Sequence, residues 1–326
     1  VFAGSLFVIS IGYLYTIVGS LNMAYISQTI SSMADRRGLY LVGAVMIFVF
    51  CMKGALFPLF TWMNRSYAAP PIAISIIFGA LLTKVGLYSI IRTYGLFYYE
   101  SNFIKSYILI LGAVSIIAGC IGAIYQKDLK QIVIFNIVIS LGVMVCGTAT
   151  LNTFGVKGAL LYAVNDILLK AALFIVVGLI IYVSGVKYLQ KCGLINKYPL
   201  LGWIYFIIVL SLAGVPPFSG FYGKALIIKG LVTNNNTFIA ILVALSGLVV
   251  FYSLIRIFLN VFYDNINKSL ILEPLPKGVQ IPLIAIVAIA LIIGVSSNLL
   301  DGFFDKGIQM VLNPQHYIDL VLKKGA

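Results

Sequence analysis

Five charged residues lie inside long apolar stretches, where isolated charges are rare. They are Lys53, Lys84, Asp166, Lys170 and Lys224. A lysine or aspartate at the centre of a lone membrane helix costs about 2.5–3.5 kcal/mol, so five cost on the order of 10 kcal/mol before any pairing. Burial disfavours the charged form of a lysine, so such a side chain can take up and release a proton near neutral pH. The chemistry that this set predicts is proton transfer.

Two of these charges are close in sequence. Asp166 and Lys170 are four residues apart and therefore share one face of a helix. A purely structural ion pair between them is an open alternative to proton transfer, as is a structural partner elsewhere for each of the other lysines. We expect Asn165 to hold a water molecule beside Asp166, and Tyr162 to line the same path.

The elements that must hold these charges are membrane helices. The 326 residues are 62% hydrophobic and 10% charged, with a mean hydropathy of +1.09, whereas a soluble domain is about 25% charged. A membrane span needs about 20 apolar residues. We therefore predict an all-α integral membrane protein with about nine transmembrane helices. The predicted spans are 1–26, 38–62, 72–97, 104–126, 129–150, 157–185, 199–231, 238–263 and 281–299.

The seventh predicted span is too long for one straight helix and contains its own break. The segment 214–220 reads Gly214-Val215-Pro216-Pro217-Phe218-Ser219-Gly220. Prolines cannot donate to the hydrogen-bond ladder of a helix, and glycines permit a turn. We predict two half-helices joined by unwound backbone, which is tolerated at membrane depth only where it is buried or lines a wet cavity. Such breaks are frequent at the ion sites of transporters.

Loop charges predict the orientation, because cytoplasmic loops carry the excess of Lys and Arg. The loops after the second, fourth, sixth and eighth spans hold eight such residues and the other loops hold four. The first set is Arg65, Lys127, Lys130, Lys187, Lys191, Lys197, Lys268 and Lys277; the second is Arg36, Arg37, Lys105 and Lys157. Residue 1 is then expected on the cytoplasmic side, and the tail 300–326 outside. Within that tail, 315–324 has the pattern of an amphipathic surface helix.

Several classes of function have no support in the sequence. The net charge of +13 is spread between apolar stretches rather than clustered, which argues against nucleic-acid binding. There is no phosphate-binding loop, no dinucleotide fingerprint and no metal-ligand spacing, so we expect no cofactor, no bound metal and no enzyme activity. The four cysteines are expected to be free thiols. Val1 enters an apolar segment directly, without the features of a signal peptide, so we expect the chain to be the later part of a longer protein.

Several segments together resemble a known family. They are Lys53 to Trp62 (KGALFPLFTW) with Pro70-Pro71, Leu82 to Tyr88 (LTKVGLY), Asp128 to Gln131 (DLKQ), Tyr162 to Lys170 (YAVNDILLK) and Ser211 to Lys224 (SLAGVPPFSGFYGK). In this order they resemble the proton-conducting module shared by Mrp-type multisubunit Na+/H+ antiporters, respiratory complex I and membrane hydrogenases. The motifs and the short tail look most like the D subunits of Mrp antiporters.

The resemblance implies a fold of fourteen helices with two inverted five-helix repeats. Residues 1–103 would be the end of the first repeat, 104–263 the second repeat, and 264–326 the last transmembrane helix and an extracytoplasmic tail. The earlier helices of the family fold would precede residue 1.

The resemblance also implies a role for each lysine. Lys53 resembles a lysine that pairs with a glutamate on an earlier helix, and Lys84 the central lysine of the relay. Lys170 resembles the relay residue of the second half-channel, where Asp166 would serve beside it. Lys224 resembles the terminal lysine at the second broken helix.

The leading hypothesis is a proton-translocating subunit of a multisubunit Na+/H+ antiporter in a bacterial plasma membrane. Its partners would be other antiporter subunits and lipid, and its ions H+ and Na+. One alternative is a proton-pumping subunit of a redox-driven complex, which would use the same lysines. A second alternative is a scaffold that transports nothing, which the cost of five deep charges disfavours.

Overall fold

The computed structural model describes residues 2–33, 37–263, 273–276, 278–295 and 301–322, and the secondary structure there consists of helices and turns. The first half contains α1 (Phe2–Val18), α2 (Met23–Ser32), α3 (Arg37–Lys53), α4 (Thr61–Ala68), α5 (Ile72–Ile77), the π-helix η1 (Phe78–Leu82), α6 (Thr83–Phe97), α7 (Asn102–Tyr125) and α8 (Leu129–Ala149). The second half contains α9 (Thr153–Ser184), η2 (Leu194–Asn196), α10 (Pro199–Ala213), α11 (Ser219–Thr233), α12 (Thr237–Ile257), η3 (Phe258–Phe262), α13 (Gln280–Val295), α14 (Asp301–Leu312) and α15 (Pro314–Leu322).

The all-helical membrane architecture is confirmed, but the predicted nine spans are not confirmed. Within the described ranges, five helices are long and apolar enough to cross a membrane, or six if the bent pair α1–α2 counts as one span. Helices α3, α10 and α13 are apolar but shorter. Helices α3 and α10 end at breaks within apolar stretches that we counted as whole spans, and α13 is described only as far as Val295.

Three of the predicted spans, 1–26, 38–62 and 199–231, are broken. The span predicted at 1–26 consists of α1 and α2, which meet at an angle of 57°. The second ends at Lys53 and resumes as α4 at Thr61, a break that the sequence analysis missed. The span predicted at 199–231 is divided into α10 and α11, and this break was predicted.

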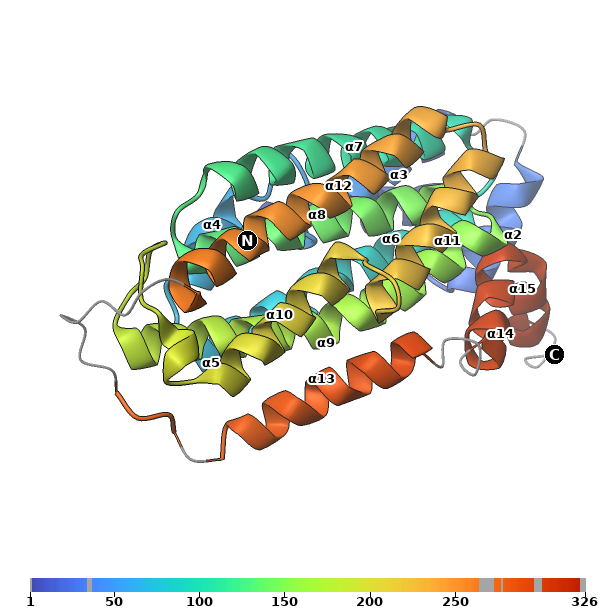
Figure 1. Ribbon diagram of the computed structural model, residues 1–326. Helices are drawn as coiled ribbons and strands as arrows, with labels where there is room; N and C mark the ends of the chain where they lie inside the picture. Colours follow the sequence, from blue (N-terminus) through green and yellow to red (C-terminus); the bar gives the residue numbers. More distant parts are fainter. Residues whose placement is uncertain (1, 34–36, 264–272, 277, 296–300, 323–326) are drawn as a thin grey trace.

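Helix α8 lies at the centre of the bundle and is buried along its length. Helices α7, α9, α11 and α12 pack around it (Figure 1). Small residues let these helices approach closely, as is usual in membranes. At Gly112 a Cβ would lie 2.6 Å from Cys146 Sγ, and at Gly158 it would lie 2.7 Å from the backbone nitrogen of Ile227.

The C-terminal helices cover one end of the bundle, beside α2 (Figure 1). Lys157 at the start of α9 forms a salt bridge of 3.1 Å with Asp305 on α14. The guanidinium carbon of Arg92 on α6 lies 4.1 Å from the ring centroid of Tyr317 on α15. The helix predicted at 315–324 corresponds to α15 (Pro314–Leu322), with 323 and 324 outside the described residues, and α14 is a second tail helix that the sequence analysis did not predict.

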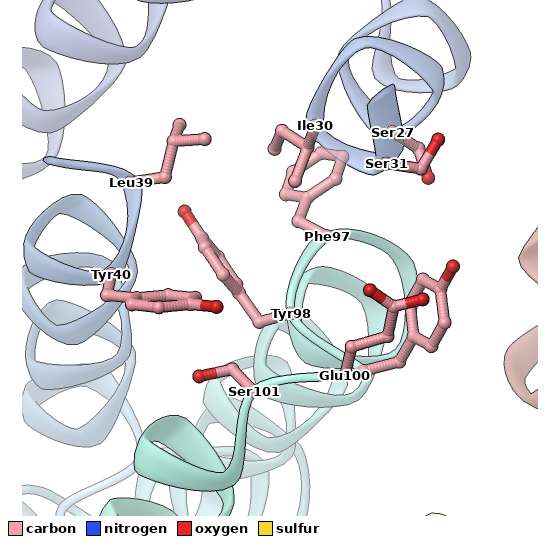
Figure 2. A pocket seen from close by; sticks show the side chains of 10 residues that line it. Ser27, Ile30, Ser31, Leu39, Tyr40, Phe97, Tyr98, Glu100 and Ser101 are labelled. Carbon is pink, nitrogen blue, oxygen red and sulfur yellow. The ribbon is translucent and has the colours of Figure 1, made fainter. Parts of the chain in front are cut away.

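A small pocket of about 10 Å³ lies near this end, between α2, α3 and the residues after α6. Figure 2 shows Ser27 and Ser31 on one side of it, and the rings of Tyr40 and Tyr98 on the other. The pocket is separate from the buried charges of the bundle core.

Part of the charge pattern used for orientation cannot be placed. Arg36, Lys268 and Lys277 lie outside the described residues, as does the side chain of Arg37.

Candidate functional site

A buried ion pair joins α6 to α9 in the bundle core. Lys84 Nζ lies 2.6 Å from Asp166 Oδ2, and the two side chains are 8% and 0% exposed. Ser140 on α8 donates a hydrogen bond of 3.1 Å to the same carboxylate oxygen. The other oxygen, Asp166 Oδ1, has no hydrogen-bond partner among the described residues. Three helices therefore meet at one carboxylate that retains a free acceptor.

The sequence left open an ion pair between Asp166 and Lys170, and the structure shows a different pair. Asp166 is four residues from Lys170 on α9, but among the described residues its ion pair is with Lys84. Lys170 is itself buried, at 1% exposed. Because an i,i+4 neighbour lies on the same helical face, Asp166 is positioned between Lys84 across the interface and Lys170 along its own helix.

A π-helix positions Lys84. The turn η1 ends at Leu82, and its Gly79 carbonyl accepts a hydrogen bond of 3.4 Å from Lys84 Nζ. A Cβ at residue 79 would lie 2.2 Å from the ring of Phe174 on α9, so this position requires glycine. Single π-turns inside α-helices are frequent at functional sites. The wider turn and the close contact bring Lys84 within reach of α9.

Hydroxyl and amide groups connect α9 to the helix break. Ser219, the first residue of α11, donates a short hydrogen bond to Asn165 Oδ1. Its hydroxyl also lies 3.1 Å from that of Ser211 near the end of α10. Asn165 Nδ2 is buried without a partner among the described residues. Tyr162, one turn earlier on α9, is buried with its ring centroid 5.5 Å from Lys224 Nζ.

The break between α10 and α11 presents Lys224 to backbone carbonyls. Helix α10 ends at Gly214, which adopts a left-handed conformation with φ of +85°. Lys224 Nζ donates to the carbonyl oxygens of Leu212 at 3.0 Å and Ala213 at 2.9 Å. Lys224 is 6% exposed and lines a cavity of about 490 Å³ between α11 and α12.

Lys53 is the exception among the five predicted residues. It is the last residue of α3, and its side chain is exposed rather than buried. It lines a cavity of about 600 Å³ with residues of α1, α3, α4, η1 and α6. The sequence analysis did not predict the break that ends α3 at Lys53.

Two polar contacts on α8 were missed by the sequence analysis. One is the hydrogen bond from Ser140 to Asp166. The other is a buried bond of 3.0 Å from Asn136 Nδ2 to Ser253 Oγ on α12. Asn136 and Ser140 stand four apart in an otherwise apolar helix, and this spacing is the signal that could have identified both.

The described residues contain no group of three or more His, Cys, Asp or Glu side chains suited to a metal ion. The four cysteines are free, as predicted. Burial raises the pKa of the Cys192 thiol, which lies in the loop before α10. This thiol is therefore protonated and a poor nucleophile at neutral pH.

The family model described as NADH:quinone oxidoreductase/Mrp antiporter, TM, matches residues 1–249. The chain belongs to this family. It is 39% identical over 329 residues to the D subunit of the Na(+)/H(+) antiporter of Bacillus subtilis (strain 168), and 36% identical over 327 residues to that of Alkalihalophilus pseudofirmus. Each alignment covers 99% of this chain and 66% of the relative, so the chain spans slightly less than two thirds of the length of these proteins.

Solved structures show the same fold. A chain of the Mrp complex from Dietzia sp. DQ12-45-1b superposes with a TM-score of 0.90 at 22% identity, covering 98% of this chain and 68% of that one. A chain of the archaeal membrane-bound sulfane sulfur reductase gives 0.87 at 22% identity, covering 97% and 65%. Respiratory complex I from Thermus thermophilus gives 0.83 at 20% identity, covering 97% and 66%. The family and the apolar helices together make the chain a multi-pass membrane protein.

Proposed function

We propose that this chain is the proton-translocating part of a subunit of a multisubunit Na+/H+ antiporter. The observation that carries the proposal is the series of buried charges from Lys84 and Asp166, through Lys170, to Lys224. Lysines are costly at membrane depth and usually mark an ion path there. A bundle held only by packing would have leucine at these positions.

The proposed relay passes protons along α9. Asp166 binds Lys84 when that lysine is charged, and it stabilises a charge on Lys170 when Lys84 is neutral, because opposite charges favour each other's ionised form. Asp166 Oδ1 and Asn165 Nδ2 offer an acceptor and a donor that the described residues leave free. Water molecules bound there would connect Asp166 and Lys170 with the Ser219 hydroxyl at the helix break.

The proposal extends to the ends of the path. Lys224, beside the cavity between α11 and α12, would exchange protons with one side of the membrane. Lys53, exposed in the cavity between α1, α3 and α6, would pair with a carboxylate outside this chain's described part. Residues 1–103 would end one inverted repeat and 104–263 would form the other, with 264–326 as the last helix and tail.

The antiporter assignment is supported by the relatives from Bacillus subtilis and Alkalihalophilus pseudofirmus, which are D subunits of Na(+)/H(+) antiporters. It gives Na+ as the exchanged ion, a bacterial plasma membrane as the location and other antiporter subunits as the partners. The second candidate is a proton-pumping subunit of a redox-driven complex. It is supported by the similar fold of chains in the sulfane sulfur reductase and complex I.

One experiment separates the two candidates. The full-length protein is expressed with its neighbouring subunits in an antiporter-deficient bacterium, and a proton gradient in everted vesicles is followed with a ΔpH-sensitive dye. For an antiporter, Na+ added after electron flow has stopped collapses the gradient, and Lys84→Ala abolishes that response. For a redox-driven pump, Na+ has no effect, and proton uptake follows an added electron donor instead.

A further inference from the structure

The Lys224 ammonium occupies a site formed by backbone carbonyls at the end of α10. Its Nζ lies 3.0 Å from the carbonyl oxygen of Leu212 and 2.9 Å from that of Ala213. The last carbonyls of a helix carry partial negative charge and lack partners within the helix. The site is therefore a pair of oxygens oriented toward a monovalent cation.

Two glycines leave room around this cation. A Cβ at Gly247 on α12 would lie 2.9 Å from the Ala213 carbonyl oxygen and 3.6 Å from Lys224 Nζ. A Cβ at Gly214 would lie 3.0 Å from Cδ of Lys224. Both glycines line the cavity of about 490 Å³ that extends along α11 to Lys229 and Thr233. An ion entering this cavity therefore meets no side chain from position 214 or 247 as it approaches the carbonyls.

We propose that the carbonyls of Leu212 and Ala213 form a binding site for a monovalent metal cation such as Na+, and that protonated Lys224 and the metal ion occupy it in turn. Unwound backbone and helix C-termini coordinate monovalent cations in this way in other membrane proteins. The two carbonyls would supply part of the coordination shell, with water from the cavity completing it. This inference rests on the proposed function, because it names the place where the exchanged cation binds.

The exchange conserves charge. The Lys224 ammonium releases one proton to water in the cavity and becomes a neutral amine, which leaves the carbonyls, and one Na+ binds in its place. When Na+ leaves, the amine takes up a proton and returns. Among the described residues, the charged or titratable groups that interact with Lys224 are Asp166, Lys170 and Tyr162 on α9, and Cys120 on α7. Lys229 lies further along the same cavity.

The test is equilibrium binding of radioactive ²²Na+ to the purified full-length protein in its complex, between pH 6 and pH 9. In the wild type, the Kd for Na+ is expected to rise as pH falls, approaching about tenfold for each pH unit once Lys224 is mostly protonated. Lys224→Met removes the competing ammonium, so binding should persist and lose most of this pH dependence. Lys224→Arg keeps a permanent cation at the carbonyls and should abolish binding at every pH.

Gly247→Ala tests the room around the site independently. Its methyl group crowds the Ala213 carbonyl, and the Kd for Na+ should rise at least about tenfold. Gly12→Ala on α1 is the matched control, because a Cβ there meets nothing within 4 Å, and its Kd should equal that of the wild type.

The outcomes separate the inference from the proposed function. If Na+ drives proton movement in vesicles but Lys224→Met keeps the wild-type pH dependence of binding, the carbonyl site is wrong while the antiporter stands. If the wild type shows no Na+-driven proton movement but its Na+ binding responds to these variants as stated, the site stands and the antiporter is wrong. Absence of Na+ binding to the wild type overturns the site in either case.

Discussion

Asp166 is the buried carboxylate that can balance the positive charge of the neighbouring buried lysines. It is fully buried, it pairs with Lys84 from another helix, and it accepts a hydrogen bond from Ser140. Its position one turn before Lys170 allows it to interact with either lysine. A carboxylate between two lysines lets the charge on one respond to the proton on the other, which a relay requires.

Removing this carboxylate charge should be costly. In Asp166→Asn, Lys84 is left buried and unpaired, and breaking such a pair costs about 3–5 kcal/mol. We expect a lower midpoint of thermal unfolding in detergent and loss of proton translocation. Asp305→Asn breaks the half-exposed pair with Lys157, and as the control it should cost only about 0.2–1 kcal/mol. Equal costs for the two variants would contradict the assigned burial of Asp166.

Ser140 is expected to tune the carboxylate rather than hold the fold. Ser140→Ala removes one hydrogen bond to a charged group, worth about 1.5–3 kcal/mol at most. Because that bond helps to hold the carboxylate that pairs with Lys84, its loss should lower the rate of transport at nearly normal assembly. Ser140→Thr keeps the hydroxyl and should restore the wild-type rate. A Ser140→Ala protein with an unchanged rate would show that this hydroxyl does not act on the relay.

At the scale of elements, the breaks in the helices place the functional lysines. The α10–α11 break was predictable, because two adjacent prolines between glycines cannot continue a helix. The break after Lys53 was not, because Gly54 to Phe60 is apolar with a single proline and keeps the composition of a span. Ala55 there has φ of +54°, a conformation that its sequence does not signal.

The pairing of Lys84 with Asp166 also could not be predicted from the sequence. The spacing of Asp166 and Lys170 along one helix was visible, and both residues are buried as expected. The contact to Lys84 depends on how α6 packs against α9, through the π-turn η1 and the contact of Gly79 with Phe174. Such packing between distant segments has no local signal in the chain.

The close packing of α11 against the end of α10 gives a testable prediction. A Cβ at Gly220 would lie 1.9 Å from the carbonyl oxygen of Ser211, so Gly220→Ala must push α11 away from the end of α10. Overpacking of this kind costs about 1–3 kcal/mol or more. We expect reduced yield of the folded complex by size-exclusion chromatography, whereas Gly4→Ala, with nothing within 4 Å, should behave as wild type. Normal assembly of Gly220→Ala would contradict the geometry of the break.

At the scale of the whole molecule, the loop charges predict an orientation that labelling can test. Lys187 follows α9, and Asn235 lies between α11 and α12; both are exposed. In separate variants that each add one cysteine to the wild type, an impermeant maleimide added to intact cells should label Asn235→Cys. The same reagent added to everted vesicles should label Lys187→Cys. The protein with its four native cysteines gives the background. The reverse pattern would invert the proposed direction of the path.

The central claim is that the buried charges serve transport and are not needed for the fold. The most direct test is the double variant Lys84→Met/Asp166→Leu, in which apolar side chains of similar size replace the ion pair. Such replacements often leave stability unchanged or increase it. We predict a complex that assembles normally and unfolds no earlier than the wild type, with Na+-driven proton movement in everted vesicles reduced to the level of empty vesicles. Proton movement at the wild-type rate in this normally assembled variant would contradict the account.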